Sequence, residues 1–429
     1  MRGTIIAMLA AALLVPSPAL AESEQWIVAV DLWGNTAYST LAIDRDGERI
    51  SGDLDGDRVE GAVSKRKLEF TAANAKGYPS RFTATLSGDR ASGEAEMPDT
   101  NDAARRVRHA FTARRIPDRP TGGPRVIDFQ PTDYSNAFDP HRTPVLTIWP
   151  GDTVRTSTID SGGVDATGVT RALFGNPQTG PFFVAGAAPG DTLVVTIKRL
   201  ALNRDWADSL DAVVGRAAGL SLAKQLDGLG KPVRWRLDRT RGTASPEGAE
   251  GALEDYAVPL RPMLGGLAVA PGFGFQPVST GDTGNFGGNM DFNEVVEGNR
   301  VYLPVQQPGA LLYLGDAHAL QGDGETTQYA LETSMDVEFS VDLVKGKRIA
   351  MPQVESPTEI MVLGQAGSLD DALKAANTGM IAWLRADYGM TLSQAAQVMG
   401  SAAKFSIANL AGRSVGVAAK LDKSLLPKR

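Results

Sequence analysis

Residues 311–325 read LLYLGDAHALQGDGE, and this stretch carries the most informative pattern in the chain. Its apolar first half favours a buried β-strand that runs into Gly315. Asp316 and His318 follow two positions apart, so a continued extended backbone would point both side chains to one face of a sheet. We therefore expect this strand to bring two polar side chains to the same place.

A second acidic pair, Asp323 and Glu325, follows the turn at 321–322. Carboxylate oxygens and imidazole nitrogens at this density suit a divalent metal ion. A carboxylate that does not bind the metal could act as a general base on a bound water. The alternative is that Asp316 and Asp323 only cap turns and that His318 is an ordinary core histidine.

Two glycine-rich stretches lie upstream. Residues 158–165 (TIDSGGVD) and 281–291 (GDTGNFGGNMD) both combine glycines with carboxylates. Glycine allows the backbone to approach a ligand closely, but such stretches are also typical of surface loops. Asp160 would end a strand and could face a pocket, although an acid at this position is also typical of a turn cap.

The chain beyond residue 126 is predicted to form strands first and helices last. Strand patterns include residues 145–148 and 192–197, whereas residues 208–229 have some helical periodicity and residues 238–255 resemble a polar loop. Near the end, Ser368 and Thr391 are in suitable positions to cap two helices, the second ending at Gly400. Helices that follow a strand-rich region indicate an α+β, β-rich fold.

Residues 22–118 read as short strands separated by tight turns such as Asp55-Gly56. Asp-Gly pairs between alternating runs are a strong hairpin signal, so we predict a small antiparallel β-meander or barrel. The run DLDGD within it matches a calcium loop poorly and is better explained as a hairpin turn. A Pro/Gly linker at 119–125 would separate this domain from a second one at 126–429.

The first 21 residues predict a secretory signal peptide. Arg2 precedes an unbroken apolar run at 5–15, and Ala19-Leu20-Ala21 forms an A-x-A cleavage site. A membrane anchor is the alternative, but the run is shorter than the ~18 residues that a spanning helix needs. The mature protein would therefore be periplasmic or secreted, with no membrane association after cleavage.

Composition excludes several classes of function. The chain has 429 residues, no Cys and a formal net charge of −7. It therefore has no disulfide scaffold and no thiol nucleophile, and its mild acidity argues against a nucleic-acid partner. The sequence contains no G-x-S-x-G, H-E-x-x-H or P-loop motif. The chain has three histidines, so the chemistry is expected to rest on carboxylates, at most a few histidines, backbone groups and a metal.

Several motifs together resemble those of the acetamidase/formamidase family. The resemblance runs from about Val126 to Pro427 and leaves the N-terminal meander outside it. Its motifs are PGDTVRTSTIDSGG (150–163), TGPFFVAGAAPGDTL (179–193), GNFGGNMD (284–291), VYLPVQQPGALLYLGDAHALQGDGE (301–325), SLDDALKAA (368–376) and VGVAAKLDKSLL (415–426).

The resemblance implies a larger β-sandwich-like domain that hydrolyses short carboxamides such as formamide or acetamide to carboxylate and ammonia. It implies a metal-activated water, with zinc as the expected ion and calcium or another divalent ion as alternatives. It assigns Asp291, Asp316, His318 and Glu325 to the metal site, with Asp160 as a weaker candidate ligand, and Asn289 to substrate positioning. Glu325 is expected to be either the general base or a ligand. Asp323 is a second candidate for the catalytic role, and Gly288 is expected beside the substrate.

This chain departs from the family pattern at three positions. Many relatives have Glu where this chain has Ala185 and Ala188, and His or Tyr where it has Phe286. These differences leave an alternative open, a non-catalytic periplasmic protein that binds a small molecule or a metal on the same scaffold. In either case we expect a small-molecule partner and a homo-oligomer.

Overall fold

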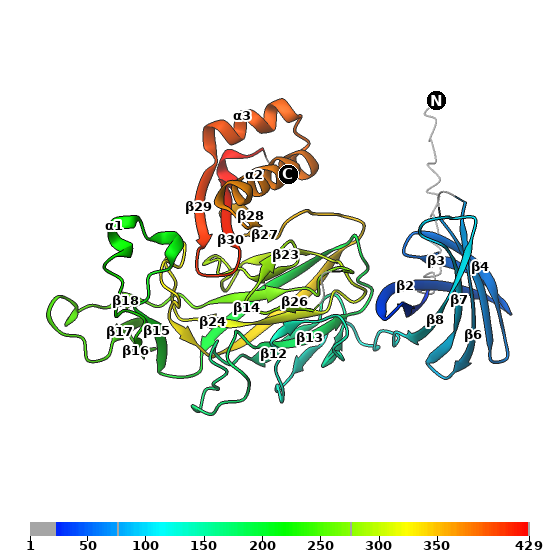
Figure 1. Ribbon diagram of the computed structural model, residues 1–429, viewed down its shortest axis with the longest axis horizontal. Coiled ribbons are helices and arrows are strands. Elements are labelled where there is room, and N and C mark those ends of the chain that lie inside the picture. The colour runs from blue at the N-terminus through cyan, green and yellow to red at the C-terminus, as the bar shows by residue number, and fades with distance from the viewer. Residues whose placement is uncertain (1–22, 75–76, 275–276, 428–429) are drawn as a thin grey trace, which may run out of the picture.

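A computed structural model describes residues 23–74, 77–274 and 277–427. The predicted signal peptide, residues 1–21, lies outside these ranges. No helix within them is both long and apolar enough to cross a bilayer. The α+β, strand-rich class predicted from the sequence is confirmed, with a small barrel beside a larger unit that contains two big sheets (Figure 1).

The N-terminal unit is a closed antiparallel barrel in which each strand pairs with the next and β8 returns to β1. Side chains alternate along β1, so Trp26 and Val28 fill the interior while Ile27 and Ala29 are less buried. The barrel strands are β1 (Glu24–Leu32), β2 (Asn35–Asp46), β3 (Arg49–Leu54), β4 (Asp57–Ser64), β5 (Lys67–Ala73), β6 (Pro79–Ser87), β7 (Arg90–Pro98) and β8 (Arg106–Arg115).

The DLDGD run forms a hairpin turn between β3 and β4. Asp53 Oδ1 accepts a hydrogen bond from the Gly56 N–H at 2.8 Å, and Asp55 Oδ1 accepts one from the Thr40 N–H at 2.9 Å. Asp53 therefore holds the turn itself and Asp55 joins it to the neighbouring strand β2, which fits the hairpin turn predicted from the sequence.

The larger unit is built on two sheets that share one hydrophobic core, with residues such as Leu314 from one sheet and Leu193 from the other. The first sheet runs β18 (Val258–Pro259), β17 (Thr243–Pro246), β16 (Pro232–Asp238), β15 (Trp206–Leu210), β25 (Glu332–Thr333), β24 (Leu312–His318), β19 (Met263–Ala268), β22 (Gly287–Asn289) and β21 (Thr283–Gly284). Beside this path, β13 (Gln178–Val184) pairs with β24, and β11 (Leu146–Ile148) pairs with β13.

The second sheet runs β29 (Lys404–Asn409), β30 (Val415–Asp422), β28 (Glu359–Ala366), β27 (Gln353–Glu355), β23 (Arg300–Pro304), β14 (Thr192–Leu202), β26 (Met335–Val344), β12 (Thr153–Ser157) and β9 (Val126–Asp128). A separate pair joins β10 (Ala137–Phe138) and β20 (Val278–Ser279). The barrel thus ends at Arg115 and the sheets of the larger unit begin at Val126. That the two units are independent domains stays a prediction.

Both predicted C-terminal helices are present, α2 (Leu369–Tyr388) and α3 (Leu392–Ala402). Ser368 and Thr391 cap them by accepting hydrogen bonds from the N–H groups of Asp371 and Gln394. The α3 helix continues two residues past Gly400, because glycine weakens a helix without ending it.

The helical periodicity of residues 208–229 was a wrong indication. This segment contains the end of β15, the 3-10 helix η1 (Gly215–Ala217) and the four-residue α1 (Leu220–Ala223). Pairing of β15 with β16 and β25 takes the first residues into the sheet, and glycines interrupt the remainder. The predicted loop at 238–255 contains β17 and the 3-10 helix η2 (Gly251–Leu253) as well, and a third 3-10 helix, η3 (Lys423–Leu425), follows β30.

Candidate active site

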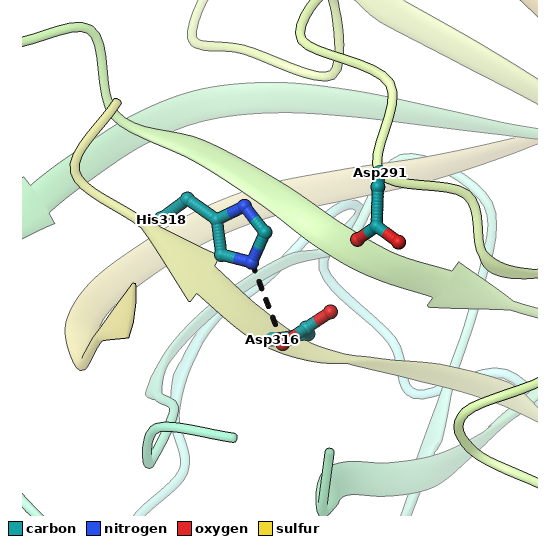
Figure 2. Close-up of side chains that lie close together, drawn as sticks. All are labelled: Asp291, Asp316 and His318. Atoms are coloured by element: carbon teal, nitrogen blue, oxygen red, sulfur yellow. Dashed lines mark ion pairs between the residues drawn. The ribbon is translucent and has the colours of Figure 1, made fainter. Parts of the chain in front are cut away.

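The strand predicted at the start of residues 311–325 is β24. It is buried in the first sheet and pairs with β19, β13 and β25. Its last residues place Asp316 and His318 on one face, with His318 Nε2 3.5 Å from Asp316 Oδ1 (Figure 2). Glu332 on β25 is the direct cross-strand partner of His318, and its Oε1 lies 3.2 Å from the same Nε2. All three side chains are buried.

Asp291 reaches this place from the turn after β22, and its carboxylate points toward Asp316 and His318 (Figure 2). Asp291 Oδ2 accepts hydrogen bonds from the side-chain amides of Asn289 and Asn409, the latter at 2.6 Å. Asn409 is the last residue of β29 in the second sheet. The position of Asp291 therefore depends on both sheets.

Glu325 completes a carboxylate–histidine cluster of five residues: Asp291, Asp316, His318, Glu325 and Glu332. Oxygen and nitrogen atoms of His318, Glu325 and Glu332 lie within 4.8 Å of one another, as do those of Asp291, Asp316 and His318. Glu325 Oε1 also accepts a hydrogen bond from the Ala330 N–H at 3.1 Å, which orients its carboxylate.

Gln321 determines which nitrogen of His318 faces the cluster. The Gln321 amide nitrogen donates to the backbone oxygens of Asp291 and Ala408, so its Oε1 is the acceptor that lies 2.9 Å from His318 Nδ1. Nδ1 therefore carries a hydrogen, and Nε2 is directed toward the carboxylates. A ring held in this way presents Nε2 for a metal ion, as is common for metal-binding histidines.

Strained backbone is concentrated at this site. Among the described residues, nine non-glycine residues have a positive φ, and four of them contribute side chains here: Asn176, Asp291, Asp316 and Glu325. The left-handed region costs an ordinary residue about 1–2 kcal/mol. Such residues gather at active sites, where surrounding structure holds them in place.

The cluster carries excess negative charge in a buried setting. Burial, followed by the neighbouring carboxylates, raises the pKa values of Asp291 and Glu325 well above their usual range, and burial raises that of Glu332. Burial alone would lower the pKa of His318, but Glu332 and Asp316 outweigh it and raise the pKa well above its usual value. The negative charges of Glu332 and Asp316 therefore favour a positive charge at His318 Nε2.

Four buried polar atoms of the cluster have no hydrogen-bond partner among the described residues: Asp291 Oδ1, Asp316 Oδ1, His318 Nε2 and Glu332 Oε2. Unpaired buried polar atoms are rare in folded proteins and require an explanation. Three carboxylate oxygens and one imidazole nitrogen are a donor set that suits a divalent cation. The residues present therefore fit such an ion.

A pocket of about 270 Å³ opens onto the cluster. Asn176 and Asn289 lie on its wall, where the Asn176 amide donates to Asn289 Oδ1 and to Asp316 Oδ2, the latter at 3.1 Å. Phe174 and Tyr329 also line it, with ring centroids 6.1 Å apart. The site thus combines a charged floor with amide and aromatic walls.

An acetamidase from Yersinia enterocolitica of known crystal structure is 30% identical to this chain, with a TM-score of 0.62 over 72% of this chain and 95% of its own. This chain belongs to the acetamidase/formamidase family. The resemblance stated from the sequence motifs is thereby confirmed. The sequence pattern of the Acetamidase/Formamidase family matches residues 276–404, a range that contains all five residues of the cluster.

Two further relatives support this assignment. A predicted acetamidase/formamidase from Thermoanaerobacter tengcongensis, also of known structure, is 27% identical with a TM-score of 0.61, over 71% of this chain and 97% of its own. The acetamidase of Mycolicibacterium smegmatis is 43% identical over 61 residues, which are 14% of this chain and 15% of that relative. The aligned stretch thus spans a small part of this curated relative. Both structural matches leave more than a quarter of this chain unmatched.

Three of the site residues predicted from the sequence lie outside the cluster. Asp160 is buried in an ion pair with Arg204 at 2.8 Å, and its other oxygen accepts from the Val164 N–H. Asp323 is exposed and accepts from the Asn293 amide at 2.8 Å. Gly288 serves close backbone packing, because a Cβ there would lie 2.3 Å from Asp282 O.

Sequence reasoning missed Glu332, Asn176 and Asn409. Glu332 is a single acid in LETSM, and Asn409 a single amide in IANLAG, so neither stands in a motif. Glu332 lies opposite His318 only because β25 pairs with β24. Asn409 reaches Asp291 only because the two sheets are in contact. Asn409, a lone polar residue in an apolar run, is the one that the sequence could have signalled.

The departures from the family pattern lie away from the pocket. Ala185 and Ala188 belong to the segment after β13, where Ala185 N–H donates to Ile148 O and Ala188 N–H to Asp191 Oδ2. Phe286 packs against Phe138. None of the three is among the residues that line the pocket. The structure therefore removes the main reason for expecting an inactive member of the family.

Proposed function

We propose that this chain hydrolyses the C–N bond of a short carboxamide to a carboxylate and ammonia. Membership of the acetamidase/formamidase family supports this reaction class. The observation that carries the proposal is the convergence of four buried ligand atoms without a hydrogen bond among the described residues, beneath a pocket of about 270 Å³. That volume accommodates a small amide with some space beyond it.

We further propose that Asp291, Asp316, His318 and Glu332 hold a divalent ion, with zinc as the first candidate. When bound, such an ion supplies a Lewis acid for the amide carbonyl and lowers the pKa of water to about 7. Glu332 takes the ligand position that the sequence had given to Asp160, because Asp160 is neutralised by Arg204.

Glu325 is the residue that we propose for proton transfer. Its burial and raised pKa suit a group that must both accept and return a proton near neutral pH. Glu325 would accept a proton from the attacking water as the new C–O bond forms. It would then give that proton to the amide nitrogen as the C–N bond breaks, so that ammonia can leave.

Asn289 and Asn176 have a positioning role in this proposal. The Asn289 amide donates to Asp291 Oδ2 and its oxygen accepts from Asn176, so both ends of the side chain are occupied. Asn176 in turn donates to Asp316. The two amides therefore hold the orientation of two ligand carboxylates and form the wall that a substrate would face.

The experiment is ammonia release from formamide, acetamide and longer amides, measured together with metal content. We expect activity to disappear after chelation and to return with one divalent ion. Asp316→Asn should lose bound metal and activity together, since it removes a ligand charge. Asp323→Asn is the matched control, an exposed acid in the same segment that should keep both.

Two outcomes would contradict the proposal. Full activity of metal-free, folded protein would remove the metal from the reaction. Metal and amide binding without ammonia release, across the whole panel, would favour the non-catalytic alternative.

We also propose that the mature chain is exported and forms a homo-oligomer. N-terminal sequencing of periplasmic protein would test the export, and sedimentation would test the oligomeric state.

A further inference from the structure

A second cavity in the described structure lies away from the candidate active site, between the barrel and the larger unit. Its volume is about 770 Å³. One wall is the outer surface of the barrel, which includes Ile27 and Arg114, and the other comes from the larger unit, which includes Phe183 and Leu311. Figure 1 shows the barrel beside the larger unit, joined to it by the segment after β8. We call this space the interdomain cleft.

Contacts across the boundary hold the two walls in place. Ile27 packs against the core cluster of the larger unit, and Tyr38 OH lies 2.7 Å from His141 Nδ1. The Arg114 guanidinium lies over the Phe183 ring, 5.7 Å from its centroid. The cleft is therefore part of the folded arrangement of the two units.

The charge of the cleft is opposite to that of the protein as a whole. The chain has a formal net charge of −7, yet the described lining contains three arginines and no carboxylate. One of the three, Arg142, is paired with Asp133 at 2.6 Å. Arg90 and Arg114 remain, and neither has a carboxylate at ion-pair distance within the described residues.

Arg90 and Arg114 are direct cross-strand partners on β7 and β8. Like charges placed opposite each other on antiparallel strands destabilise the pair. An anion between them would relieve that repulsion, and two guanidinium groups can bind a carboxylate with charge-assisted hydrogen bonds. The charge and placement of the pair therefore suit one negative group.

The remaining lining of the cleft mixes hydroxyl and amide side chains with an apolar part, and one edge of that part has left-handed backbone. Ile27, Phe183 and Leu311 contribute hydrophobic surface. Ala310 and Leu311 both have positive φ, at 56° and 58°, an unusual pair for residues with side chains. Strained backbone of this kind gathers at ligand clamps as well as at active sites.

We propose that the interdomain cleft binds a small organic carboxylate with an apolar body, its carboxylate between Arg90 and Arg114 and its body against Phe183 and Leu311. The family structures leave more than a quarter of this chain unmatched, so the barrel wall can provide a function beyond the shared fold. The proposal does not depend on amide hydrolysis.

The test is titration of the full-length mature protein with 2-naphthoate, a fluorescent aryl carboxylate, at low ionic strength. We expect saturable binding that the neutral alcohol 2-naphthylmethanol does not show. Arg90→Gln and Arg114→Gln should each weaken binding about tenfold, as expected for loss of a charge-assisted contact. Amide hydrolysis should not change in either variant.

Arg108→Gln is the matched control, because Arg108 lies on the same strand β8, outside the cleft, near Glu94 and Glu96 at 4.0 and 3.9 Å. It should bind 2-naphthoate as the parent protein does. Asp316→Asn should also keep binding, which separates the cleft from the candidate active site. Ser92→Glu, at an exposed lining position, is a second test because it adds a repelling charge.

Equal affinity in folded Arg90→Gln, Arg114→Gln and parent protein would overturn the proposal. So would equal binding of 2-naphthylmethanol, or loss of 2-naphthoate binding in Asp316→Asn. Melting curves establish that each variant is folded before its affinity is compared.

Discussion

Gly265 shows how closely the carboxylates of the cluster are packed. A Cβ at this position would lie 2.5 Å from Asp291 Oδ1 and 2.7 Å from Asp316 Oδ2. We expect Gly265→Ala to push these oxygens away from their present positions and to lower metal affinity and turnover together. The fold should persist, with a stability loss of about 1–3 kcal/mol from overpacking. Metal titration and denaturant unfolding measure the two effects.

Gly400→Ala is the control for this substitution. Gly400 lies within α3 and a Cβ there would meet nothing within 4 Å. The change should be neutral or stabilise the helix by about 0.5–1 kcal/mol, with metal affinity unchanged. A Gly265→Ala protein with parental metal affinity would show that the two carboxylates are not the ligands.

Glu325 can be separated from the ligands by its response to substitution. Glu325→Gln keeps the size of the side chain but removes the proton acceptor. If Glu325 transfers protons, turnover should fall about 10²- to 10⁴-fold while bound metal stays the same. Steady-state rates and metal analysis of the same sample check this expectation.

Rescue of the Glu325→Gln rate by added metal would instead assign Glu325 as a ligand. Parental turnover would remove it from the reaction, and the proton-transfer role would then need another carboxylate of the cluster.

At the scale of elements, Asp152 joins the start of the larger unit to the turn before β12. Its carboxylate accepts hydrogen bonds from the backbone N–H groups of Arg125 and Trp149 and from the Arg125 guanidinium, which lies 2.6 Å away. Burial works to raise the pKa of Asp152, but these hydrogen bonds outweigh it and hold the pKa below its usual range.

The pKa of Asp152 is lower in the folded protein than its value of about 3.9 in the unfolded chain. The ionised side chain therefore stabilises the fold above about pH 4, and this stabilisation is lost as the pH falls through the pKa of the folded state. Asp152→Asn should therefore lower the free energy of unfolding by about 2 kcal/mol at pH 7. The difference from the parent protein should shrink below about pH 4. Denaturant unfolding at several pH values measures this.

Asp128→Asn is the comparison for Asp152→Asn, since the Asp128 side chain is 81% exposed and lies 3.9 Å from Arg155. Its effect should stay within about 0.5 kcal/mol. A pH-independent loss in Asp152→Asn would mean that the ion pair with Arg125 is not the source of the stabilisation.

At the scale of the whole molecule, the barrel has its own core and closes its own hydrogen bonding. We expect a chain that starts at Ile116 to fold, bind metal and keep any amidase activity, because the cluster takes no residue from the barrel. Ile116 is retained because it belongs to the core of the larger unit. The shortened chain should no longer bind 2-naphthoate.

Solubility, metal content and ammonia release of the shortened chain check this expectation. If it is insoluble under conditions where the full mature chain is soluble, the barrel is an integral layer of the larger unit. Retained 2-naphthoate binding would place that ligand elsewhere.

Local patterns were enough to predict much of the architecture. Turn residues between alternating runs predicted the barrel strands, and Ser368 and Thr391 predicted the starts of α2 and α3, because these features depend on neighbours in the sequence. The i, i+2 spacing of Asp316 and His318 likewise placed both on one face of β24. Residues 208–229 failed because pairing in the sheet outweighed a weak periodicity.

By itself, then, the sequence determined the strand-rich class, the C-terminal helices and the segment that carries Asp291, Asp316, His318 and Glu325. The tertiary structure alone decided that Glu332 joins them, that Asn409 orients Asp291, and that Arg204 neutralises Asp160. These contacts join residues far apart in the chain across strands and between sheets. No local spacing encodes them, because strand register and the meeting of two sheets are set by packing of the whole fold.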